Sequence, residues 1–115
     1  MTESQLNARM DMERNVVSKL LQVAKAHGYA VVKVDDGEEV HKVTTDEQAM
    51  DAVFAVDEAT IRFKHPDEPK THCAVIVLGN DGWDAIADAS VGEKWDAVME
   101  EMNQYTDTLE QGVQP

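Results

Sequence analysis

The chain has 115 residues, which predicts a single domain spanning residues 1–115, and its 43% hydrophobic content excludes wholesale disorder. It carries 23 acidic against 10 basic side chains, a formal net charge of −13. That charge argues against direct binding to nucleic acid or to anionic membranes, and it favours a basic protein partner.

The negative charge is concentrated beyond the first third of the chain. Residues 1–34 hold three acids and five bases, a balance of +2, whereas residues 35–115 hold 20 acids and five bases, a balance of −15. The single Cys73 excludes an internal disulfide, and no apolar stretch approaches the roughly 18 residues needed to span a bilayer. With no signal-peptide pattern at residues 1–5, we expect a cytoplasmic protein.

The pattern predicts a long helix first. Thr2 and Gln5 form a capping box, Gly28 supplies a stop, and apolar residues recur at three- and four-residue spacing. The predicted stripe is Leu6, Met10, Val17, Leu20, Leu21 and Ala24.

A hairpin is predicted next, formed by strands 29–34 and 39–43 around the Asp-Gly pair at 36–37. Thr45 to Gln48 then make another capping-box pattern, which predicts a short helix through Val56. Met50, Val53 and Phe54 are its expected inward residues.

Strand 60–65, a proline turn at 66–70 and strand 71–78 follow. Strand 71–78 is apolar on both faces, which is typical of a central strand and makes Cys73 an expected buried thiol. Residues 79–82 predict a turn, and residues 83–88 a strand, with helix as the competing interpretation.

Residues 90–93 form a capping box for a long last helix, whose apolar stripe is Trp95, Val98, Met99, Met102, Tyr105 and Leu109. The order αββαβββα predicts an α+β fold, with three helices and an antiparallel sheet of about five strands. Whether the strands form one sheet or two stays open at this point.

The last helix carries the strongest functional signal, an acidic ridge opposite its apolar stripe. The expected partner-binding residues are Glu93, Asp96, Glu100 and Asp107, extended by Asp84 and Asp88. One helical turn rises about 5.4 Å, comparable with phosphate spacing along a DNA strand, so such a ridge imitates a row of phosphates. The alternative is a solvated helix face that only keeps the protein soluble.

The sequence gives little support for a metal site or for a catalytic site. The four histidines and Cys73 lack zinc-ligand spacing, and the Asp-Gly turns at 35–39 and 80–84 do not complete a calcium loop. No nucleophile elbow, phosphate-binding glycine loop or metalloprotease motif occurs. We therefore expect no catalytic residues, no metal and no cofactor.

Residues 77–88 (VLGNDGWDAIAD) resemble a segment of small acidic phage- and prophage-encoded proteins of unknown function. The resemblance covers about a tenth of the chain and carries over no site residues. It implies a context in which small accessory proteins bind and inhibit host or defence machinery, several of them as acidic nucleic-acid mimics.

The leading functional hypothesis is a non-enzymatic, phage-type inhibitor that occupies a basic, nucleic-acid-binding surface of a partner protein in the host cytoplasm. The main alternative is a structural or assembly module, a homodimer formed through an apolar surface of the first helix or an open sheet edge. A small enzyme using Asp or His residues is the third hypothesis.

Overall fold

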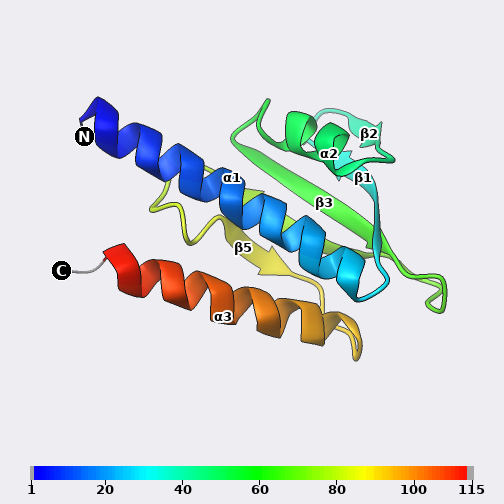
Figure 1. The fold of residues 1–115 in the computed structure, drawn as a ribbon. Helices are drawn as coiled ribbons and strands as arrows, with labels where there is room; N and C mark the ends of the chain where they lie inside the picture. The colour runs from blue at the N-terminus through cyan, green and yellow to red at the C-terminus, as the bar shows by residue number, and fades with distance from the viewer. Residues whose placement is uncertain (1, 114–115) are drawn as a thin grey trace.

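The computed structural model describes residues 2–113, which form an α+β fold with three helices and one five-stranded antiparallel sheet (Figure 1). The elements follow in the expected order αββαβββα. Their bounds are α1 (Glu3–Ala26), β1 (Ala30–Asp35), β2 (Val40–Lys42), α2 (Asp46–Val53), β3 (Glu58–Lys64), β4 (His72–Val77), β5 (Ile86–Ala89) and α3 (Trp95–Val113).

All five strands belong to one sheet, in the order β2-β1-β3-β4-β5. The three helices form one layer on one face of the sheet, because α1 contacts both α2 and α3 and α2 also contacts β1 and β3. α3 runs back alongside α1 in the opposite direction (Figure 1). The result is a two-layer molecule whose shortest extent is 19 Å.

The helix boundaries follow from local chemistry. Thr2 accepts a hydrogen bond from the Gln5 N–H and the Gln5 side chain accepts one from the Thr2 N–H, which confirms the predicted capping box. α1 ends at Ala26, and Gly28 adopts a φ of +89° that a side chain would disfavour. Thr45 caps α2, although this helix ends at Val53 rather than Val56.

The core lies between the helix layer and the inner face of the sheet. Ile61 and Phe63 of β3 and Ile76 of β4 are fully buried there, together with Trp95 of α3. The predicted apolar stripe of α1 is buried, as expected, from Val17 onward. Its first two members are exposed, Leu6 at 38% and Met10 at 43%, and Val16 and Val23 are buried instead.

The two faces of the sheet differ in burial. Along β3, Ala59, Ile61 and Phe63 are buried, whereas the residues between them are only half-buried. β4 is an interior strand, but its expected burial on both faces is not observed within one molecule. Cys73, predicted to be a buried thiol, is half-buried on the outer face, because the helices of residues 2–113 pack on the inner face.

Two predicted boundaries near the C-terminus are wrong. The last strand starts at Ile86 rather than Trp83, because the Asp84 carboxylate accepts the N–H groups of Asp81 and Gly82 and holds this segment in a turn. The last helix starts at Trp95 and is not capped by Ser90, whose hydroxyl accepts the Cys73 N–H instead.

Candidate partner-binding groove

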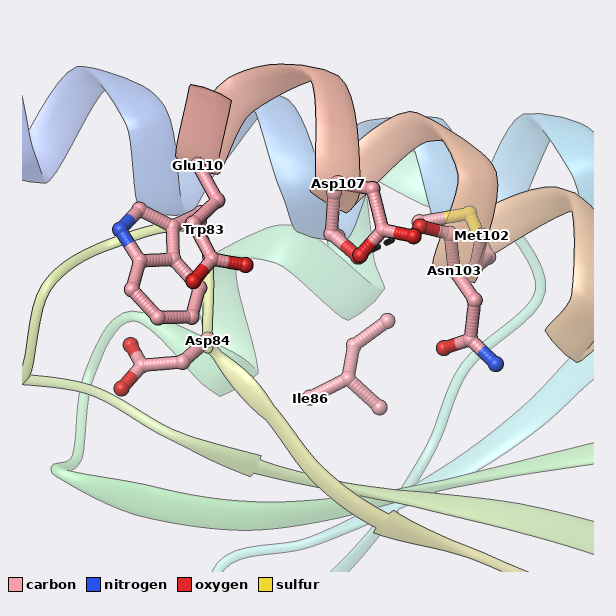
Figure 2. A pocket seen from close by; sticks show the side chains of 8 residues that line it. Trp83, Asp84, Ile86, Met102, Asn103, Asp107 and Glu110 are labelled. Atoms are coloured by element: carbon pink, nitrogen blue, oxygen red, sulfur yellow. Dashed lines mark hydrogen bonds between the residues drawn. The ribbon is translucent and has the colours of Figure 1, made fainter. Parts of the chain in front are cut away.

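A groove runs between α3 and the edge strand β5 and consists of two adjoining hollows, of about 200 and 300 Å³. Ile86 and Asn103 line both hollows, which joins them into one feature that we call the α3–β5 groove. In Figure 2, the Glu110 side chain extends from α3 toward Trp83 and Asp84, and Ile86 lies below Asp107. The groove is therefore framed by a rigid helix on one side and a strand on the other.

Carboxylates line both walls of the groove. The strand side contributes Asp84 and Asp88, and the helix contributes Asp96, Asp107 and Glu110. No Lys, Arg or His is among the described residues that line either hollow. The apolar lining includes Trp83, Ile86, Met99 and Met102, so the groove combines an apolar floor with an acidic rim.

The structure brings together four of the six residues expected to bind a partner. Asp96 and Asp107 lie on the same side of α3, with Asn103 between them, as helical spacing requires. Asp84 faces them from the other wall, and Asp88 lines the second hollow from the outer side of β5, where its carboxylate accepts the Ala89 N–H. By strand register Asp88 lies opposite Val75, which places its side chain at the outer rim of the sheet edge.

The other two predicted residues lie outside the groove lining. Glu100 is exposed on α3, one turn from Asp96, and does not line either hollow. Glu93 is exposed in the turn before α3, so it is not part of a continuous helical ridge. The reason is the later start of the helix, where the first turn is closed by hydrogen bonds between Gly92 and Asp96.

Two residues that line the groove, Trp83 and Glu110, are not among the six expected to bind a partner. Their pairing depends on the loop before β5, which no helical periodicity reveals. Glu101 instead faces α1, where its carboxylate lies 2.9 Å from His27 Nε2.

The backbone of β5 adds a further feature. Within the described residues β5 pairs only with β4, so its other edge has no strand partner. Such an edge accepts an additional extended segment through main-chain hydrogen bonds.

A second polar cluster lies at the first turn of α3 and adjoins the groove, because its Ser90 lines the second hollow. Glu68, in the turn between β3 and β4, accepts hydrogen bonds from the Tyr29 hydroxyl and from His72 Nε2, the latter at 2.7 Å. These two hydrogen bonds, Tyr29 first, hold the pKa of Glu68 below its ordinary value. Burial, followed by the bond to Glu68, raises the pKa of Tyr29.

This cluster continues to Ser90, whose Oγ lies 3.1 Å from His72 Nδ1, and therefore has the Ser-His-Glu order of a hydrolase site. The Ser90 hydroxyl, however, is already held by the Cys73 N–H at 2.9 Å. The Trp95 indole stacks on the His72 ring, and Gly92 lies close against the same imidazole. We interpret the cluster as a structural connection between the β3–β4 turn and α3.

Within residues 2–113, no group of three or more His, Cys, Asp or Glu side chains is arranged to hold a metal ion. None of the described helices is long and apolar enough to cross a membrane. No protein-family model, curated protein or solved structure matches the chain.

Proposed function

We propose that this chain is a non-enzymatic binding protein whose α3–β5 groove receives an extended basic segment of a partner protein. The observation that carries the proposal is the lining of the groove, in which five carboxylates from two walls surround an apolar floor. Neither a metal nor a cofactor is part of this proposal.

A lysine or arginine side chain fits this combination of groups. Its aliphatic stem packs on Ile86 and Met102, and its cationic head reaches Asp84 or Asp107 on the rim. Trp83 adds an aromatic ring near the same hollow, where cation–π attraction contributes. The unpaired edge of β5 supplies main-chain hydrogen bonds to an extended segment.

Proteins bind nucleic acid through surfaces rich in lysine and arginine, the same side chains that this groove would receive. The exposed carboxylates of Asp96, Glu100 and Asp107 follow one side of α3 and extend the acidic rim beyond the groove. We therefore propose a phage-type inhibitor that takes the place of a nucleic acid on a host or defence protein in the cytoplasm. The resemblance of residues 77–88 to phage-encoded proteins supports this context.

The test measures binding of a fluorescent nonapeptide of alternating arginine and valine by anisotropy. We compare the unmodified protein with Asp84→Asn/Asp107→Asn, and with the matched control Glu47→Gln/Asp51→Asn on α2. Both variants remove two acidic charges, and Glu47, Asp51 and Asp107 are all exposed in the structure. Because a hydrogen bond to a charged group is worth about 1.5–3 kcal/mol, the groove variant should lose about tenfold or more in affinity.

Raising the salt concentration should weaken binding to the unmodified protein, since the contact is electrostatic. The control variant should bind nearly as tightly as the unmodified protein. Equal losses in both variants would mean that the peptide responds only to net charge, and the proposed groove would then be wrong.

A further inference from the structure

The outer face of the sheet is a surface that the proposed function does not use. By register it carries Cys73, Val75 and Val77 of β4, which are half-buried, and Val40 of β2, which is 55% exposed. A strand that is apolar on both faces is typical of sheets covered on both sides. Here the three helices cover only the inner face.

Charges on this outer face are segregated along the strands. Lys42, Lys33 and Arg62 lie directly opposite one another on β2, β1 and β3. Two residues further along each of the central strands, the same face carries Asp35 of β1 and Thr60 of β3, followed by Glu58. One end of the outer face is therefore basic and the other acidic, with the apolar residues of β4 beside both.

The basic row is unfavourable in an isolated molecule. Like charges directly opposite on neighbouring strands repel each other. Within residues 2–113, Lys33, Lys42 and Arg62 form no ion pair. A surface that brings negative charge to this row would offset the repulsion. If that surface were also apolar beside β4, it would shield the half-buried residues of that strand from water.

We infer that a second copy of this chain covers the outer face, with the two sheets packed face to face and their strands antiparallel. A two-fold axis lying across the strands places the basic end of each copy over the acidic end of the other. Lys33 then lies against Asp35 of the second copy, Arg62 lies beside its Glu58, and the β4 residues of the two copies meet.

The face is complementary to itself, which is what an isologous contact requires. A nucleic acid would meet only the short basic row and would be repelled by the acidic end and by the net charge of −13. The surface also differs from the α3–β5 groove, so this inference does not depend on the proposed function.

Two charge-reversed variants test the inference by sedimentation velocity, with far-UV circular dichroism to check folding. Lys33→Glu/Arg62→Glu leaves Lys42 alone in the basic row, and Asp35→Lys/Glu58→Lys replaces both acids of the acidic end with bases. We expect the unmodified protein to be dimeric at micromolar concentration and each variant alone to be monomeric. An equimolar mixture of the two variants should form a heterodimer, which also shows that both are folded.

Cys73 provides a second measurement that needs no substitution. Since its half-buried thiol lies on the outer face, its rate of reaction with a maleimide should fall as protein concentration rises. A monomeric unmodified protein at 100 µM (roughly a hundredfold above a micromolar Kd) would overturn the inference. So would variants that dimerise as well as the unmodified protein, or binding of a DNA oligonucleotide abolished by Lys33→Glu/Arg62→Glu.

Discussion

The imidazole of His72 lies parallel to the indole of Trp95, with ring centroids 5.5 Å apart and an interplanar angle of 4°. This contact joins the start of β4 to the first turn of α3 and so fixes where the helix begins on the sheet. His72 is in turn held by Glu68 at 2.7 Å, and Trp95 is fully buried against Phe63. The position of α3, and with it one wall of the groove, depends on this stack.

Gly92→Ala should disturb that stack. A Cβ at this position would lie 2.4 Å from His72 Cε1, so the ring must move and weaken its contacts with Trp95 and Glu68. We expect a loss of about 1–3 kcal/mol in the free energy of unfolding, as for other overpacked sites. Urea denaturation measures the loss, and Gly112→Ala is the matched control.

Gly112 has no atom within 4 Å of an added Cβ. Its replacement by alanine within α3 should leave stability unchanged or raise it by up to about 1 kcal/mol. If Gly92→Ala proved as well tolerated as Gly112→Ala, the tight contact between Gly92 and His72 would not hold the helix in place.

Ile61 should be among the most sensitive core positions. It is fully buried on the inner face of β3, opposite Val34 and Ala74. Ile61→Val should cost about 0.5–1.5 kcal/mol and Ile61→Ala about 2–5 kcal/mol, because the second change leaves a larger cavity. Chemical denaturation of both variants checks the gradation, and similar small losses in both would contradict the observed packing.

Thr45→Ala should destabilise α2 through loss of its cap. The Thr45 hydroxyl accepts the Gln48 N–H at 3.1 Å, and its removal should cost about 0.5–2 kcal/mol. Thr45→Ser keeps the hydroxyl and serves as the control. Thermal unfolding of the two variants measures this difference in stability. Equal melting temperatures would show that the cap does not contribute to stability.

The turn between β1 and β2 should respond to pH through His41 and Asp36. Hydrogen bonds from the Glu39 N–H, from His41 and from the Glu38 N–H lower the pKa of Asp36 to about 2, and the Asp36 carboxylate raises the pKa of His41 above its ordinary 6.5. The stabilisation from charged His41 is complete below pH 6.5 and is lost as pH rises through the raised pKa. That from Asp36 is present above pH 3.8 and is lost as pH falls toward about 2.

An NMR titration of the imidazole protons measures this directly. In the unmodified protein His41 should titrate above pH 6.5, and in Asp36→Asn its pKa should return toward that value. An identical titration of His41 in both proteins would show that the 2.7 Å contact with Asp36 is not maintained in solution.

Periodicity predicted each helix and strand because these elements form through interactions between residues that are close in the sequence. The spacing of Val17, Leu20 and Ala24 predicts a buried helical stripe whatever lies opposite, and the Thr2 cap closes within four residues. The same reasoning correctly predicted that Asp96 and Asp107 share one side of α3. It failed at Glu93, because the Ser90 hydroxyl hydrogen-bonds the β4 backbone, far away in the sequence, instead of capping the helix.

The chain's order of elements, its helix caps and its acidic excess are properties of neighbouring residues and of composition, and they can be read without coordinates. Only the tertiary structure decided that Asp84 lies across a groove from α3, because the turn before β5 sets that distance. It also decided that the helices cover a single face of the sheet. The alternation of apolar and polar residues along a strand indicates how apolar each of its two faces is. It does not indicate which element packs against either face.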